Sequence, residues 1–158
     1  MEHEPLEEKL RELLRKYEVS PELLTLEITE TALVINPMKA RRTIDALVQL
    51  GIHFSIDDFG AGYTSFKYLK TFRISEIKID QEFVTGIEKE SFDACLVQSI
   101  AHFCRGLGVR LIVEGVETQS DLDILVELGC ETGQGYHMAR PMPIEDLKLW
   151  LGKNSLKR

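Results

Sequence analysis

The chain has 158 residues, 44% hydrophobic and 28% charged, which is the composition of one globular domain rather than of a disordered or fibrous segment. Its formal net charge of −7, with no basic cluster beyond Arg41-Arg42, argues against a nucleic-acid-binding protein. No apolar run approaches the roughly 20 residues that cross a bilayer, and the first residues carry no signal-peptide pattern, so we expect a cytoplasmic protein without a membrane span.

Hydrophobic periodicity predicts helices alternating with strands along the whole chain. Helices show apolar residues at helical spacing and close at glycines such as Gly51, Gly108 and Gly129, whereas the strands are short apolar or alternating runs. The predicted helices cover residues 6–17, 38–50, 63–72, 91–107, 119–128 and 144–151, and the predicted strands cover residues 24–29, 53–56, 76–79, 110–113 and 133–138. About five strands interleaved with helices predict an α/β fold with a parallel sheet and no internal domain boundary.

Polar residues follow the predicted strands at the same end of each. They are Glu27, Glu30, Asp57, Asp58, Lys78, Asp80, Glu114, Glu117 and Gln134. Because parallel α/β folds build their sites at the carboxyl ends of strands, these side chains are expected to converge on one mouth. So many carboxylates raise one another's pKa unless cations neutralise them, and carboxylate oxygens suit Mg²⁺ or Mn²⁺. The pattern favours a metal-dependent phosphate site.

Several of these residues also have a plain structural interpretation. Glu30, Asp80 and Glu117 can each be a helix cap or a solvated loop charge, and Lys78 can face outward from its strand. The pair Asp57-Asp58 is harder to explain structurally, because a cap accounts for one acid after an apolar strand and not for two.

Five ordered motifs resemble the later motifs of EAL domains, over about residues 6–151. They are Leu26-Glu27-Ile28-Thr29-Glu30, Asp57-Asp58-Phe59-Gly60-Ala61-Gly62-Tyr63, Lys78-Ile79-Asp80, Glu114-Gly115-Val116-Glu117-Thr118 and Gln134-Gly135-Tyr136. The resemblance implies part of a TIM-type (β/α) barrel. It also implies the family reaction, which is hydrolysis of cyclic di-GMP to pGpG with two Mg²⁺ or Mn²⁺ ions.

The resemblance implies three metal ligands. Glu27 would bind the first ion, Asp57 would bridge both ions, and Asp58 would bind the second. Two ions bridged by one carboxylate can activate water and stabilise the leaving oxygen in a phosphodiester attack.

The remaining roles implied by the resemblance concern catalysis and nucleotide binding. Glu114 would be the general base or a ligand of the second ion, Lys78 would hold the attacking water, and Asp80 would position Lys78. Glu117 and Gln134 would face the nucleotide.

Glu30 would anchor the loop from Asp58 to Phe66, which the family uses to couple dimerisation to activity. A second interpretation follows from that loop. The chain could be a non-catalytic regulatory module that contacts another signalling protein through residues 57–66 and the neighbouring helices.

The family's Glu-Ala-Leu signature, the arginine after it and a metal-binding asparagine have no counterpart here, which leaves Glu27 and Asp57 as ligands of the first ion. The sequence therefore resembles a truncated EAL domain, spanning residues 1–158 as a single unit. We expect weak metal binding and little activity from this chain alone. A third interpretation is a split enzyme whose other polypeptide supplies the missing strands.

The missing strands lead to an expectation about assembly. About five strands cannot close an eight-stranded barrel, so residues 24–29 and 133–138 would form open edges, and apolar strand residues would lack part of their cover. We expect a homo-oligomer, or a partner domain over the open edges. The alternatives are aggregation and a rearrangement in which the helix of residues 6–17 folds over the gap.

Overall fold

The computed structural model describes residues 6–60 and 69–154, with the backbone alone at Glu30 and Val34. One parallel sheet of four strands organises these residues, in the order β1 (Thr25–Thr29), β2 (His53–Phe59), β3 (Glu76–Ile79) and β4 (Arg110–Val113). Each strand pairs in parallel with the next along the chain. The α/β prediction is confirmed, and the carboxyl ends of all four strands lie at one edge of the sheet.

Helices connect the strands and flank the sheet. They are α1 (Leu6–Lys16), α2 (Glu30–Ile35), α3 (Pro37–Gln49), α5 (Phe92–Leu107), α6 (Gln119–Glu127) and α7 (Ile144–Asn154), with 3₁₀ turns η1 (Pro21–Leu23) and η2 (Gln81–Phe83). Helix α2 was not predicted, and it is held by Leu33, which is buried. Most of the helix predicted for residues 63–72 lies outside the described residues.

Local capping explains where the longer helices begin and end. Helix α5 starts at Ser91, whose hydroxyl accepts a hydrogen bond from the backbone of Ala94, and stops at Gly108 in the left-handed conformation. Helix α6 starts with a capping box, in which the side chains of Thr118 and Asp121 each accept from the other's backbone N–H. The predicted cap at Thr118 is confirmed, and it places Glu117 directly before a rigid helix start.

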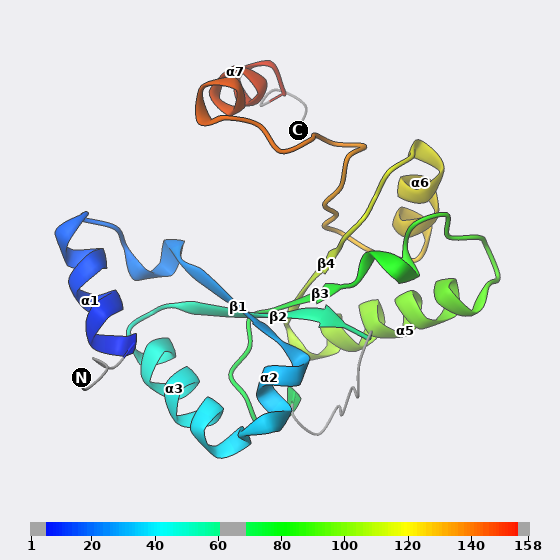
Figure 1. Ribbon diagram of the computed structural model, residues 1–158. Coiled ribbons are helices and arrows are strands. Elements are labelled where there is room, and N and C mark those ends of the chain that lie inside the picture. The colour runs from blue at the N-terminus through cyan, green and yellow to red at the C-terminus, as the bar shows by residue number, and fades with distance from the viewer. Residues whose placement is uncertain (1–5, 61–68, 155–158) are drawn as a thin grey trace.

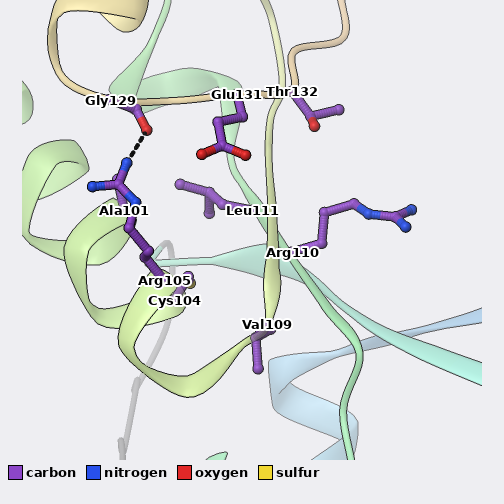
Figure 2. A pocket seen from close by; sticks show the side chains of 9 residues that line it. All are labelled: Ala101, Cys104, Arg105, Val109, Arg110, Leu111, Gly129, Glu131 and Thr132. Atoms are coloured by element: carbon purple, nitrogen blue, oxygen red, sulfur yellow. Dashed lines mark hydrogen bonds between the residues drawn. The ribbon is translucent and has the colours of Figure 1, made fainter.

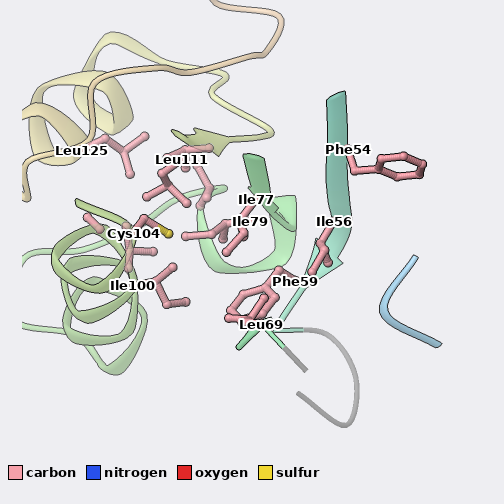
Figure 3. Close-up of a cluster of buried hydrophobic side chains, with 14 of the residues drawn as sticks. Phe54, Ile56, Phe59, Leu69, Ile77, Ile79, Ile100, Cys104, Leu111 and Leu125 are labelled. Carbon is pink, nitrogen blue, oxygen red and sulfur yellow. The ribbon is translucent and has the colours of Figure 1, made fainter. Parts of the chain in front are cut away.

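One face of the sheet is covered by helices (Figure 1). In this view α2, α3 and α5 lie below the strands, and α6 lies beyond β4. The buried cluster of Figure 3 joins Ile77 and Ile79 of β3 to Ile100 and Cys104 of α5. Both β3 isoleucines are fully buried. Burial of apolar surface on this face is the main stabilising contribution to the fold.

The opposite face of the same strands is polar, because side chains alternate between the two faces of a strand. Glu27 and Asp57 both reach Lys78 on this face, and Arg110 pairs with Glu76 at 3.4 Å. Most apolar strand residues belong to the helix-covered core, with Leu26 and Ile28 only partly buried there. Ile112, in register with Lys78, lies on the polar face and is partly buried, so the expectation of incompletely covered apolar strand residues stays a prediction. Among the described residues, the outer edge of β1 has no neighbouring strand, and the charged face of the sheet is not covered by the helices of the core.

The fifth predicted strand, residues 133–138, is reduced to one bridge between Gly133 and Val113. Beyond it the chain turns, with the backbone N–H of His137 donating to Val116 and that of Met138 to Gly135. A Cβ at Gly135 would overlap the backbone of Val116, so the two segments touch through their main chains. This close approach replaces ladder pairing and carries Gln134 to the site edge of the sheet.

The terminal helices lie at the periphery. Helix α1 packs beside α3, with Leu10 and Leu14 partly buried against the core, so the rearrangement in which it covers the gap gains no support. Helix α7 stands apart, across the polar face from α3 and α5 in Figure 1, and buries none of its residues. Among the described residues, none of the helices combines the length and the hydrophobicity of a membrane-spanning segment.

A small pocket of about 100 Å³ lies between α5, the start of β4 and the segment that follows α6, residues 129–132 (Figure 2). Arg105 crosses it and donates to the carbonyl oxygen of Gly129 at 2.9 Å, which satisfies a carbonyl just past the end of α6. Burial raises the pKa of the neighbouring Cys104 thiol to about 11, so this thiol is protonated and packs as an apolar group. The pocket is structural and lies at the opposite end of β4 from Glu114.

Candidate active site

Lys78 is the centre of the polar face. Its side chain rises from β3 and is nearly buried, with 6% of the residue exposed. Its ammonium lies 3.2 Å from Glu27, 3.0 Å from Asp57 and 2.8 Å from Glu114. Burial alone would lower the pKa of Lys78, but these three carboxylates outweigh it and raise the pKa above its ordinary value. The lysine is therefore charged and inward-facing, and the outward-facing alternative is excluded.

A bulge in β2 explains how two consecutive acids reach the same site. Ile56 pairs with Ile77, and Phe59 pairs with Ile79, so Asp57 and Asp58 together face the single residue Lys78. Asp58 has a φ of 54°, in the left-handed region, which interrupts the regular alternation of the strand. A regular strand would send one acid to each face. The bulge instead allows both carboxylates to turn toward the same mouth.

Asp57, Asp58 and Glu114 form a carboxylate cluster whose candidate ligand atoms all lie within 4.8 Å of one another. Glu114 follows β4 directly, and its backbone N–H donates to Ile79 at 3.1 Å, which continues the ladder with β3. Three convergent carboxylates are the ligand set expected for Mg²⁺ or Mn²⁺, so the residues present fit a hard divalent cation. Glu27 joins this cluster through Lys78.

Asp80 lies at the rim of the cluster. It caps η2 by accepting a hydrogen bond from the backbone of Glu82 at 2.7 Å. Desolvation and the carboxylates of Asp57 and Asp80 raise the pKa of Asp58, and a hydrogen bond from Asp58 to Asp80 adds to the shift. The contacts of Lys78 given above come from other strands, so the positioning of Lys78 by Asp80 stays a prediction.

The proposed nucleotide-facing residues lie beside the cluster. Glu117 and Gln134 line one pocket together with Glu114, and the remaining lining residues are Gln81, Gly115, Gly135 and Tyr136. Exposed Tyr136 stacks against the guanidinium of Arg140, 4.4 Å from the ring centroid. Sequence reasoning missed Gln81, which directly follows the motif Lys78-Ile79-Asp80, and gave no role to Tyr136, which lies within the motif Gln134-Gly135-Tyr136. The expected convergence on one mouth is observed for Glu27, Asp57, Asp58, Lys78, Glu114 and Gln134.

Glu30 is the first residue of α2, directly after β1. Its predicted role, anchoring the loop from Asp58 to Phe66, concerns side chains outside the described residues.

The fold and site thus define a parallel α/β protein with a cluster of acidic side chains at the carboxyl ends of its strands. The EAL domain family model matches residues 1–141. The chain belongs to the EAL domain family.

Two curated relatives come from Pseudomonas aeruginosa. The bifunctional diguanylate cyclase/cyclic di-GMP phosphodiesterase MucR is 37% identical over 92% of this chain and 21% of its own length. The cyclic di-GMP phosphodiesterase RocR is 38% identical over 87% of this chain and 35% of its own length. The chain therefore spans about a fifth to a third of these relatives.

Solved structures of EAL-type proteins are also similar to this chain. A MucR phosphodiesterase in complex with c-di-GMP has a TM-score of 0.86 at 37% identity, covering 92% of this chain and 64% of that one. Klebsiella pneumoniae BlrP1 in a manganese/cy-diGMP complex has a TM-score of 0.84 at 31% identity, covering 89% of this chain and 36% of that one. Both relatives support a partial TIM-type barrel.

Proposed function

We propose that this chain supplies the carboxyl-terminal part of a cyclic di-GMP phosphodiesterase site. The observation that carries the proposal is the convergence of Asp57, Asp58, Glu114 and Lys78 from three neighbouring strands on one point. Relatives of this chain include cyclic di-GMP phosphodiesterases, and one related structure holds manganese together with the dinucleotide. The same chemistry explains how a protein of net charge −7 handles a phosphate ligand, since cations mediate the contact.

In this proposal Asp57, Asp58 and Glu114 would hold Mg²⁺ or Mn²⁺, with Glu27 beside them. The bound ion would supply Lewis-acid stabilisation of the phosphate and a more acidic water. Lys78 adds a positive charge beside the cluster, where negative charge would develop on phosphate oxygens.

The pocket beside the cluster would take one nucleotide of the substrate. Gln134 offers amide donors and acceptors, and Glu117 offers a carboxylate that can accept from a purine N–H. Tyr136 adds an exposed ring on which a base can stack. A cytoplasmic location belongs to the same proposal and is supported by Cys95, Cys104 and Cys130 being free thiols.

A turnover assay in Mn²⁺, with chromatographic separation of cyclic di-GMP and pGpG, tests the proposal. We expect little turnover by the 158-residue chain alone, because it contains only part of the ligand set implied by the family. A chimaera in which this chain replaces the matching segment of the MucR phosphodiesterase should regain turnover. The same chimaera carrying Asp57→Asn is the matched inactive control. A folded chimaera that binds no cyclic di-GMP would refute the proposal.

We also propose that further polypeptide covers the open side of the sheet, either a second copy or other strands of a longer protein. The support is that β1 ends the sheet and exposes alternate residues along its length. Helix α7 also exposes Ile144 and Leu149. Unpaired edges and uncovered apolar residues favour association. Light scattering over a dilution series should show a concentration-dependent dimer, and a folded monomer at tens of micromolar would refute the second-copy form.

A further inference from the structure

The position of the Lys78 ammonium resembles that of a bound cation. It is held by one oxygen each from Glu27, Asp57 and Glu114, at 3.2, 3.0 and 2.8 Å. These acids come from β1, β2 and the residue after β4, so one ammonium ties together three separate strands. With only 6% of Lys78 exposed, this charge is shielded from water and from dissolved salt.

Two of the three carboxylates that hold Lys78 also belong to the divalent-cation cluster. Asp57 and Glu114 contact the ammonium, and both lie with Asp58 in the group whose ligand atoms are within 4.8 Å. A divalent ion bound by these oxygens would therefore sit a few ångströms from the ammonium. Like charges at that separation repel each other, and water screens the repulsion only in part because Lys78 itself is nearly buried, although Asp58 and Glu27 are exposed.

We propose that Lys78 is a positioning residue that acts as the internal counter-ion of the metal-free site and is displaced from Asp57 and Glu114 when a divalent cation binds. In the metal-free chain it keeps the carboxylates of Glu27, Asp57 and Glu114 gathered, because uncompensated acids this close would repel one another. When a cation enters, the ammonium leaves its place between the acids and becomes free to meet a phosphate. The identity of the cluster as a metal site rests on the proposed function.

The first test is a Mn²⁺ titration of the purified chain, in which electron paramagnetic resonance counts the free ion. Lys78→Met keeps the length of the side chain and removes its charge. We expect this variant to bind Mn²⁺ roughly tenfold or more tightly than the wild type, because a like charge has been removed from beside the ion. The control, Arg110→Met, removes a positive charge from the same sheet face at a residue paired with Glu76, and should change Mn²⁺ binding little.

Equal or weaker Mn²⁺ binding by folded Lys78→Met would overturn the inference. Binding of Mn²⁺ to neither protein would also overturn it, since the cluster would then not be a cation site.

The second test uses the wild-type chain and so does not depend on the variant folding. In uniformly ¹⁵N-labelled protein, the Lys78 ammonium should give a sharp signal protected from hydrogen exchange while its carboxylates hold it. Adding Mg²⁺ until the amide signals of Asp57 and Glu114 stop moving should shift or broaden that ammonium signal. The ammonium of Lys89, paired with Glu127 on the surface, should be unaffected. A Lys78 signal that stays in place at saturation would overturn the inference.

The inference and the proposed function fail in different ways. If Mg²⁺ displaces Lys78 but a complete chimaera neither binds nor hydrolyses cyclic di-GMP, the counter-ion role stands and the proposed function falls. If that chimaera hydrolyses cyclic di-GMP while Lys78 remains on its three carboxylates in the metal-bound chain, the function stands and the counter-ion role falls.

Discussion

The two faces of the sheet use the same strands for different purposes. On β3, Ile77 and Ile79 point into the core against α5, while Lys78 between them points into a group of carboxylates. The apolar face gains stability from buried surface, and its contacts tolerate conservative changes. The polar face gathers like charges that gain little stability by themselves, because desolvation offsets the ion pairs. Stability and site chemistry should therefore respond to different substitutions along one strand.

The largest expected effect on stability comes from the apolar face. Ile79→Ala should lower the free energy of unfolding by about 2 to 5 kcal/mol, since it opens a cavity under a fully buried side chain. Urea unfolding followed by circular dichroism measures this loss. Ile79→Val is the matched control and should cost about 0.5 to 1.5 kcal/mol. In the fraction that remains folded, Mg²⁺ binding should be unchanged. If well-folded Ile79→Ala lost Mg²⁺ binding, stability and cation binding would not depend on separate faces of the sheet.

The largest effect on the site is expected from a change at Asp57. Asp57→Asn should lower Mn²⁺ affinity by roughly 100-fold, since even the outer-shell partners of metal ligands are worth about 10 to 100-fold. The free energy of unfolding should change by only about 1 kcal/mol. Calorimetric titration with Mn²⁺ and urea unfolding of the same sample check both parts. Glu76→Gln, on the same face but paired with Arg110, is the control that should retain Mn²⁺ binding. If Asp57→Asn bound Mn²⁺ as tightly as the wild type, Asp57 would not be a ligand of the cation.

Smaller effects on stability and on nucleotide binding are expected at the start of α6, where a structural cap adjoins the pocket. Thr118 caps α6 and directly follows Glu117 at the pocket rim. Thr118→Ala should lower the free energy of unfolding by about 1 kcal/mol through loss of the capping hydrogen bond, and it should weaken nucleotide binding modestly by loosening Glu117. Thr118→Ser keeps the hydroxyl and should restore both properties. If Thr118→Ala changed stability but not nucleotide binding, the cap would be purely structural.

Much of the fold could be predicted from the sequence because its signals are local. The start and end of α5 follow from Ser91 and Gly108, and hydrophobic periodicity between them defines the buried face. The strand of residues 133–138 was predicted wrongly, because the main-chain contact between Gly135 and Val116 is a tertiary feature that no local pattern encodes. Helix α2 was missed for the same reason, since packing of Leu33 holds a short segment with little helical signal.

The sequence predicts which residues form the candidate site, but it does not predict how their side chains are arranged. Parallel topology alone brings the carboxyl ends of β2, β3 and β4 to one edge. The bulge that turns both Asp57 and Asp58 toward Lys78 could not be inferred, because a left-handed φ at an aspartate leaves no periodic signature. The contacts of Lys78 with three acids depend on strand register, which the sequence does not state.

We propose that the polar edge of this sheet is a cation-dependent cyclic di-GMP site. The most direct measurement is a two-step titration of the ¹⁵N-labelled chain, first with Mg²⁺ and then with cyclic di-GMP, because amide shifts detect even weak binding residue by residue. We expect Mg²⁺ to move the signals of Asp57, Asp58 and Glu114. Cyclic di-GMP should then move those of Glu117 and Gln134, and only when Mg²⁺ is present. Shifts confined to other surfaces, or nucleotide binding that does not depend on Mg²⁺, would contradict the proposal of a cation-dependent site.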